Sequence, residues 1–320
     1  MILEISIFIF SCFILSWLSS KFIKTLTEVA KYLGWREFIV AFFVMGFAAS
    51  LPNLFVDLNA AFRGMQQIAF GDIMGGNLID LSLGIAIAVL FSRKHISTDS
   101  KMVQNTAVFT TVIAFLPWLL VLRTGGLDRF DGVILILSFV AYAWWLFSKD
   151  DRFKKVYGGK EIRKISNKSG LAWDILKIIV ILATLLASSF AIIYSAQYFA
   201  TSLNVSLGLV AVLIIALGNC FPEIYFAVIS ARKEKNWMVL GDMMASVIVS
   251  STLVLGIVAL IAPFKIIDFS PFFVARIFMV IVCVMYLLFI ISDKKITKKE
   301  GLLLMAVYIS FLLTEVFLIK

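Results

Sequence analysis

Two stretches of the chain decide its fold: Gly46–Asp80 reads GFAASLPNLFVDLNAAFRGMQQIAFGDIMGGNLID, and Ala216–Ser250 reads ALGNCFPEIYFAVISARKEKNWMVLGDMMASVIVS. The two copies align without a gap. Their identical residues pair as Pro52 with Pro222, Ala61 with Ala231, Gly71 with Gly241, Asp72 with Asp242 and Met74 with Met244. Each pair is separated by the same 170 positions. A constant offset at so many identities is hard to produce by chance, so the chain contains an internal repeat.

The composition around these repeats is that of a membrane protein. Of the 320 residues, 62% are hydrophobic and 15% are charged, and the mean hydropathy is +1.02. An average soluble domain has about 45–50% apolar and about 25% charged residues, so an ordinary soluble protein is excluded. The three cysteines lie inside apolar stretches, so we expect no disulfide framework and no zinc site.

Apolar windows of about 20 residues predict ten membrane-spanning helices. Their expected ranges are 2–20, 37–61, 70–92, 103–122, 130–148, 172–198, 205–231, 239–262, 271–292 and 300–319, with residues 21–32 prolonging the first helix. The polar segment 149–170 separates five spans from five others, which predicts a half at 1–148, a linker at 149–170 and a half at 171–320. Because five is odd, the second half enters the membrane in the opposite orientation. We therefore predict an all-α integral membrane protein built from two inverted five-helix repeats.

The basic residues predict how these helices are oriented. Loops after the odd-numbered spans hold 20 Lys and Arg residues, whereas the opposite face, including the C-terminus, holds five. Basic loops stay on the cytoplasmic side, so we expect the linker in the cytoplasm and both termini outside the cell. This bias suits a protein of the plasma membrane. Topology and anionic membrane lipid account for the net charge of +9, so no nucleic-acid partner is expected.

Inverted repeats with interrupted helices are typical of secondary transporters, whose substrate site lies near the membrane midplane. Pro52 and Pro222 lie in the middle of spans, where proline removes a backbone donor and disrupts the helix. A structural kink explains either proline alone, but their pairing across the repeats favours a functional role. The carbonyls freed near Gly46 and near Ala216 are then candidate ion ligands, because irregular backbone at this depth lines a cavity or is buried in protein.

Polar side chains gather beside the two prolines. Glu223 follows Pro222, Asn53 holds the equivalent place in the first copy, and Asp80 and Ser250 form another repeat-related pair. A charged carboxylate within the bilayer is costly unless paired, and no Lys or Arg stands near in sequence, so a hard cation is the expected partner. The candidate ligands are Gly46, Ser50, Asn53, Asn77, Asp80, Ala216, Asn219, Glu223, Ser246 and Ser250. The alternative is that Asp80 and Glu223 are protonated and hydrogen-bond neighbouring helices.

These segments resemble the alpha repeats of the cation/calcium exchanger superfamily, which includes the sodium/calcium exchangers. Those repeats typically read GTSLPE and then GNxxGSN with a further Asn or Asp; this chain has AASLPN and GDIMGGNLID in one copy, and GNCFPE and GDMMASVIVS in the other. The resemblance places the family's paired glutamates on Asn53 and Glu223, and its acid or amide pair on Asp80 and Ser250. It implies an antiporter, not an enzyme, that exchanges Ca²⁺ for Na⁺ by alternating access without a cofactor. The helices at 2–20 and 172–198 are then the moving pair.

Several residues depart from that family pattern. Asn53 replaces a glutamate and Ser250 an Asn or Asp, so the central site has two formal negative charges, to which Asp57, one turn after Asn53, could add a third. Asp72 and Asp242 replace asparagines and are expected to cap the helices that follow them. Two other functions stay open: a cation/proton antiporter, with Glu223 or Asp80 as proton carrier, and a channel or non-transporting relative.

Overall fold

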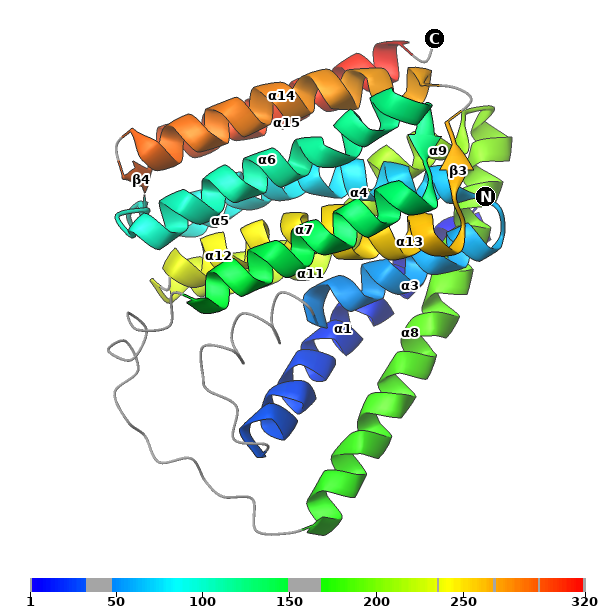
Figure 1. The fold of residues 1–320 in the computed structure, drawn as a ribbon, viewed down its shortest axis with the longest axis horizontal. Helices are drawn as coiled ribbons and strands as arrows, with labels where there is room; N and C mark the ends of the chain where they lie inside the picture. The colour runs from blue at the N-terminus through cyan, green and yellow to red at the C-terminus, as the bar shows by residue number, and fades with distance from the viewer. Residues whose placement is uncertain are drawn as a thin grey trace.

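The computed structural model describes residues 2–32, 48–148, 168–234, 236–266, 269–292 and 294–318, which are almost entirely helical (Figure 1). The first half contains α1 (Ile2–Tyr32), α3 (Ala48–Phe62), α4 (Gln66–Ile79), the π-helix η2 (Asp80–Gly84), α5 (Ile85–Phe91), α6 (Lys101–Thr124) and α7 (Arg129–Ser148). The second half begins with α8 (Lys168–Leu203), α9 (Leu207–Val210), the π-helix η4 (Ala211–Ile215), α10 (Ala216–Asn219) and α11 (Phe221–Arg232). It continues with α12 (Asn236–Ile248), the π-helix η5 (Val249–Val254), α13 (Leu255–Ile261), α14 (Ser270–Ile291) and α15 (Lys298–Leu318). The two-residue strands are β1 (Ile96–Ser97), β2 (Gly126–Leu127), β3 (Phe264–Lys265) and β4 (Lys295–Ile296).

The described helices coincide with the expected apolar stretches to within a few residues, and residues 21–32 do prolong the first helix. The part of the second stretch before residue 48, and most of the expected linker, lie outside the described residues. By length and composition, seven of the described helices are able to cross a membrane, or eight if one bent pair counts as a single span. The chain is therefore a helical integral membrane protein.

Two spans form the centre of the bundle. In the apolar windows of Gln66–Phe91 and Met238–Ile261, 78% of the residues are buried inside the protein, whereas only 28% are buried in Lys298–Phe317. Outer helices carry exposed apolar side chains such as Trp144 and Phe317, as a surface in contact with lipid requires. The central spans, in contrast, carry the buried polar residues discussed below.

Strands and helices of the first half of the chain pair with those of the second half. The antiparallel pair β1–β4 and the antiparallel pair β2–β3 each join a strand of the first half to one of the second, and they lie at opposite ends of the bundle (Figure 1). Helices pair across the halves in the same way: α5 packs on α15, α7 on α13, α4 on α14 and α6 on α12. Side chains from both halves consequently share one hydrophobic core.

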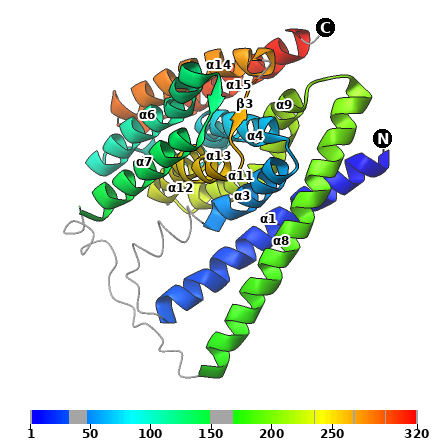
Figure 2. The same cartoon turned by 45° about the vertical axis from the view of Figure 1, so that its right-hand side comes forward.

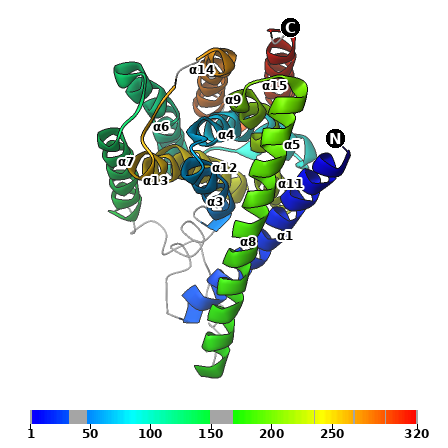
Figure 3. The ribbon, with the colours of Figure 1, turned by 90° about the vertical axis from the view of Figure 1, so that its right-hand side faces the viewer.

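Helices α1 and α8 form a pair that is inclined to the other helices (Figures 1, 2 and 3). They pack along each other, and the rest of the protein meets them mainly through α3 and the α9–α11 segment. The apolar cluster beneath them contains Cys12, Val56, Leu185 and Ile215. This pair thus rests on the remaining helices through a small number of elements.

The residues that cap helices are not those that the sequence predicted. Thr297 and Glu300 bond each other's backbone N–H groups at the start of α15, as Asp128 and Asp131 do before α7. The prediction that Asp72 and Asp242 act as caps is wrong, because α4 and α12 begin six residues earlier, at Gln66 and Asn236. The prediction rested on the preference of Asp for the N-cap position and of carboxylates for a helix N-terminus, but both helices start well before the aspartate. Both aspartates are instead buried within their spans.

Candidate cation-binding site

The helix break predicted at Pro222 is confirmed. Helix α10 ends at Asn219 and α11 begins at Phe221, and the axis of the bent pair turns by 40° at Cys220. Pro222 lies in the first turn of α11 and lacks an N–H, so the carbonyl of Gly218 loses its helical donor. The Ala216 carbonyl, by contrast, accepts the N–H of Cys220 at 3.0 Å. Pro52 lies within α3, and the candidate ligand Gly46 lies outside the described residues.

Polar side chains of the two central spans meet between α4 and η5. The Ser250 hydroxyl donates to Asn77 Oδ1 at 3.0 Å and is also 2.8 Å from the Ser246 carbonyl. Asn77 Nδ2 in turn donates to Ser251 Oγ at 2.6 Å. The structure thereby brings together three of the predicted residues and adds Ser251, which the sequence reading missed. The polar run Ser250-Ser251-Thr252 within an apolar helix was the signal for it.

The two predicted acids lie beside this hydrogen-bonded group. The Asp80 carboxyl group is within hydrogen-bonding reach of the Ser246 hydroxyl and the Cys220 thiol, and its charge acts on Glu223. Glu223 is 1% exposed, and neither of its carboxylate oxygens has a hydrogen-bond partner among the described residues. On α3, Ser50 is buried and Asn53 is half-buried.

Three further carboxyl groups are buried in the same region: Asp57 on α3, Asp72 on α4 and Asp242 on α12. Asn219 Nδ2 donates to Asp72 Oδ2 at 2.6 Å, and the Asp57 carboxyl group lies beside that of Asp72. The sequence had left open whether Asp57 adds a charge to the site, and Asn219 was predicted as a ligand of the ion rather than as a partner of Asp72. The predicted cluster is therefore larger and more acidic than two carboxylates.

None of the buried polar side chains that the structure describes is Lys, Arg or His. Five carboxyl groups consequently share a buried region without a basic partner among the described residues, and several of their oxygens accept no hydrogen bond. Buried charges of one sign require a proton or a cation. No three His, Cys, Asp or Glu side chains in the described ranges form a metal-chelating group by themselves. A cation bound here would need amide, hydroxyl and backbone oxygens as well, as hard ions prefer.

Two glycines bring the helices of this region together. A Cβ on Gly75 would collide with the Val212 carbonyl and would lie 2.8 Å from the Ala216 Cβ. A Cβ on Gly71, four residues earlier on the same helix face, would lie 2.8 Å from the Gly208 carbonyl oxygen. This small-residue stripe is typical of closely packed membrane helices, and it holds α4 against η4 and α10. Asp72 and Asn219 can bond only because of that approach.

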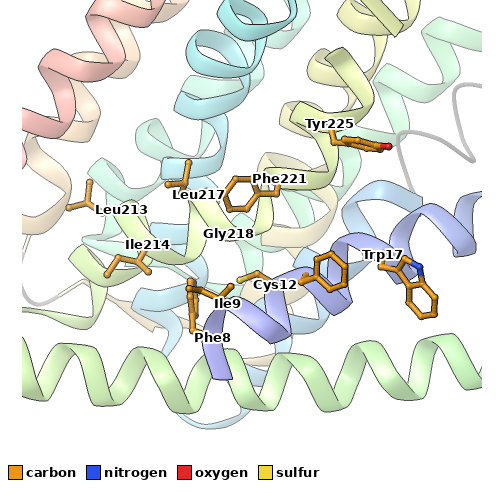
Figure 4. Close-up of a pocket in the computed structure, with 11 residues that line it drawn as sticks. Phe8, Ile9, Cys12, Trp17, Leu213, Ile214, Leu217, Gly218, Phe221 and Tyr225 are labelled. Atoms are coloured by element: carbon orange, nitrogen blue, oxygen red, sulfur yellow. The ribbon is translucent and has the colours of Figure 1, made fainter. Parts of the chain in front are cut away.

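A cavity of about 820 Å³ lies between α1 and the bent helix, next to Gly218 (Figure 4). Its walls are apolar and aromatic and include Phe8, Trp17, Phe221 and Tyr225. Such a lining offers no charged ligand, so this cavity is not the place for an ion. It does separate part of α1 from the helix that carries Glu223.

The sequence matches the family described as "Sodium/calcium exchanger protein" over residues 3–148 and 173–317. It is 23% identical to the sodium/calcium exchanger MaX1 of Methanosarcina acetivorans, over 92% of this chain and 93% of that protein. It is 26% identical to the inner membrane protein YrbG of Escherichia coli, over 82% of this chain and 81% of that one. Among solved structures it is similar to the sodium-calcium exchanger NCX_Mj, with a TM-score of 0.64 and 22% identity over 97% of both chains.

Proposed function

The chain belongs to the sodium/calcium exchanger protein family, and on that premise we propose that it is a secondary antiporter exchanging Ca²⁺ for Na⁺ by alternating access. The observation that carries the proposal is the group of buried carboxylates on α3, α11 and the two central spans, which has no basic partner among the described residues. A protein held in a membrane by lipid contacts has no structural need for so many buried charges. Binding of cations offsets the cost of burying them.

The central ligands in this proposal are Asp80 and Glu223. The other proposed ligands are the amides of Asn53, Asn77 and Asn219, the hydroxyls of Ser50, Ser246 and Ser250, and the backbone carbonyls of Gly46 and Ala216. Ca²⁺ takes about six to eight oxygens, and a set of this mixed chemistry is able to supply them. Two carboxylates balance one Ca²⁺ or two Na⁺, so the two ions exclude each other by charge. That exclusion couples their movement.

The same proposal includes ten spans arranged as inverted repeats, with halves at 1–148 and 171–320. Contacts between the halves have counterparts when every element is replaced by its equivalent in the other half. The pair β1–β4 corresponds to β3–β2, and the packing of α5 on α15 corresponds to that of α13 on α7. Both chain ends lie at the end of the bundle that carries β2–β3 (Figure 1). The basic residues Lys294 and Lys295 lie beside β1–β4 at the other end, which supports a cytoplasmic β1–β4 end and termini outside the plasma membrane.

Helices α1 and α8 are the proposed moving pair. They pack along each other and rest on α3 and the α9–α11 segment, which carry Ser50, Asn53 and Glu223. The apolar cavity beside Gly218 leaves α1 room to shift against the bent helix without breaking polar contacts. A rocking or sliding step of this pair would open the ion cluster to one side at a time.

The test is ⁴⁵Ca²⁺ uptake into proteoliposomes driven by an outward Na⁺ gradient or by a pH gradient. The matched variants are Glu223→Gln and Glu315→Gln; both residues are buried, but Glu315 lies near the end of α15, outside the cluster. We expect Na⁺-driven uptake that Glu223→Gln abolishes and Glu315→Gln retains. Uptake driven only by protons would assign a cation/proton antiporter, and flux insensitive to ions on the opposite side would assign a channel.

A further inference from the structure

Asp57 is the most completely buried of the acidic residues near the site. Its side chain is 0% exposed, and neither carboxylate oxygen accepts a hydrogen bond among the described residues. It lies beside Asp72, which is 3% exposed. Two carboxylates in contact repel each other strongly in a medium of low dielectric constant. A proton or a cation must therefore balance the pair.

No described side chain supplies that charge. Arg63, on the turn after α3, donates from Nε to Asn59 Oδ1 at 3.1 Å, and its guanidinium lies over the Phe190 ring. The ion pairs found among the described residues join Arg123 to Asp128 and Asp131, in a different part of the protein. No described basic side chain therefore balances the Asp57–Asp72 pair, which leaves a proton or a cation from solution.

The free oxygens around the pair indicate the size and charge of that cation. Asp57 Oδ1 and Oδ2, Asp72 Oδ1 and Asn219 Oδ1 are buried, and none of them has a hydrogen-bond partner in the described ranges. With its Nδ2 donated to Asp72, Asn219 has only its carbonyl oxygen left to offer. Four oxygens are fewer than the roughly six to eight that Ca²⁺ takes. By its number of oxygens this set favours a small monovalent cation, which together with one proton on the pair balances the two aspartates.

The pair also differs in position from the central ligands. Asp57 is one turn beyond Asn53 on α3, and Asp72 is two turns before Asp80 on the span formed by α4 and η2. Asp80 is still close enough for its charge to act on Asp72. An ion at the Asp57–Asp72 pair and an ion at the Asp80–Glu223 pair would therefore repel each other without sharing all their ligands.

We propose that Asp57, Asp72 and Asn219 form a second cation site, one that takes Na⁺, beside the Asp80–Glu223 cluster. Asp57 and Asp72 supply the charge, and Asn219 orients Asp72 and supplies a neutral oxygen. The part that this site plays in transport rests on the exchange proposed above, but Na⁺ binding itself does not. The close approach of α4 to α10 at Gly75 holds the two sides of the site together.

The test measures equilibrium binding of ²²Na⁺ and ⁴⁵Ca²⁺ to the purified full chain in detergent, which requires no transport. Asp57→Asn and Asp72→Asn remove the charge at nearly constant size. Asparagine is also the residue that the resembled repeats carry at the position of Asp72. Glu223→Gln removes a central ligand, and Glu315→Gln is the control for loss of a buried carboxyl group elsewhere. Size-exclusion chromatography confirms that each variant is folded.

We expect Asp57→Asn and Asp72→Asn each to weaken one class of Na⁺ sites by roughly thirtyfold or more, as loss of one partner from a buried charged group predicts. Their Ca²⁺ affinity should fall by much less than their Na⁺ affinity, because the pair acts on the central site through its charge and is not a ligand of Ca²⁺. Glu223→Gln should lose Ca²⁺ binding and keep this class of Na⁺ sites, and Glu315→Gln should change neither.

Two results would overturn the proposal. Unchanged Na⁺ binding in Asp57→Asn and Asp72→Asn would mean that the pair shares a proton instead of binding Na⁺. Parallel loss of Na⁺ and Ca²⁺ binding in folded forms of both variants would mean that the aspartates belong to one site with Glu223. A chain that binds Na⁺ as expected but fails to exchange Ca²⁺ in vesicles would contradict the proposed function and leave the second site standing.

Discussion

Replacing Gly75 with alanine tests whether close helix packing builds the ion cluster. The new Cβ would lie 2.8 Å from the Ala216 Cβ and would collide with the Val212 carbonyl. Carbon atoms pack favourably at about 3.5–4.0 Å, so α4 must move by about 1 Å away from α10. Asp72 on α4 and Asn219 on α10 are joined by a hydrogen bond of 2.6 Å. A shift of that size would stretch the bond to about 3.6 Å, which no longer counts as a hydrogen bond.

The neighbouring Gly76 provides the matched control. A Cβ there would meet only Cys220 Sγ, at 3.6 Å, which is an ordinary contact. Both substitutions gain about 1 kcal/mol of helix propensity, but only Gly75→Ala meets an overpacking cost of about 1–3 kcal/mol. Because misplacement of a functional group by about 1 Å costs on the order of a hundredfold in rate, Na⁺-driven Ca²⁺ uptake should fall by about that factor in Gly75→Ala.

The assay compares initial ⁴⁵Ca²⁺ uptake rates and apparent melting temperatures in detergent for the two alanine variants. Gly76→Ala should keep its uptake and melt at the same temperature as the unmodified chain or slightly above it. Equal uptake and equal melting of both variants would refute the reasoning, since it would show that α4 and α10 are not held at the distance that positions Asp72 and Asn219.

Three further predictions concern hydrogen bonds and charges elsewhere. Ser251→Ala leaves Asn77 Nδ2 without its acceptor, and this loss of about 1 kcal/mol or more should weaken Ca²⁺ binding by about fivefold or more. The control Ser138→Ala removes only a bond to the Ile134 carbonyl in the same helix and should leave Ca²⁺ binding unchanged. Thr297→Ala removes the cap of α15 and should lower stability by about 1 kcal/mol, which is measured as a lower melting temperature. In the control Thr314→Ala only a bond to the Ser310 carbonyl in the same helix is lost, and equal melting temperatures of the two variants would contradict the capping role. The Asp131 N–H and then the Arg123 guanidinium lower the pKa of Asp128, so its stabilising effect is complete above the unfolded pKa of about 3.9 and is lost as pH falls through the folded value. The difference in melting temperature between the unmodified chain and Asp128→Asn should therefore be present at pH 7 and shrink below about pH 4, and a difference independent of pH would exclude this linkage.

Much of this molecule is predictable from its sequence because membrane insertion is a local matter. An apolar stretch in lipid must satisfy its backbone within its own helix, so length and hydropathy locate the helices to within a few residues. The break at Pro222 follows just as directly, because proline lacks an N–H whatever surrounds it. The repeat and its constant offset pointed to Asp80, Glu223 and Ser250, and to the family.

Contacts between distant residues were decided by the tertiary structure alone. The sequence reading made Asp72 a helix cap, whereas the fold buries it between Asp57 and Asn219. It also overlooked Ser251, which is 174 positions away from its partner Asn77. Hydropathy and periodicity describe each helix by itself, but which faces meet depends on how closely two helices approach. Here that distance is set by glycines such as Gly75, whose missing side chain becomes informative only when the carbonyl of Val212 is seen to occupy its place.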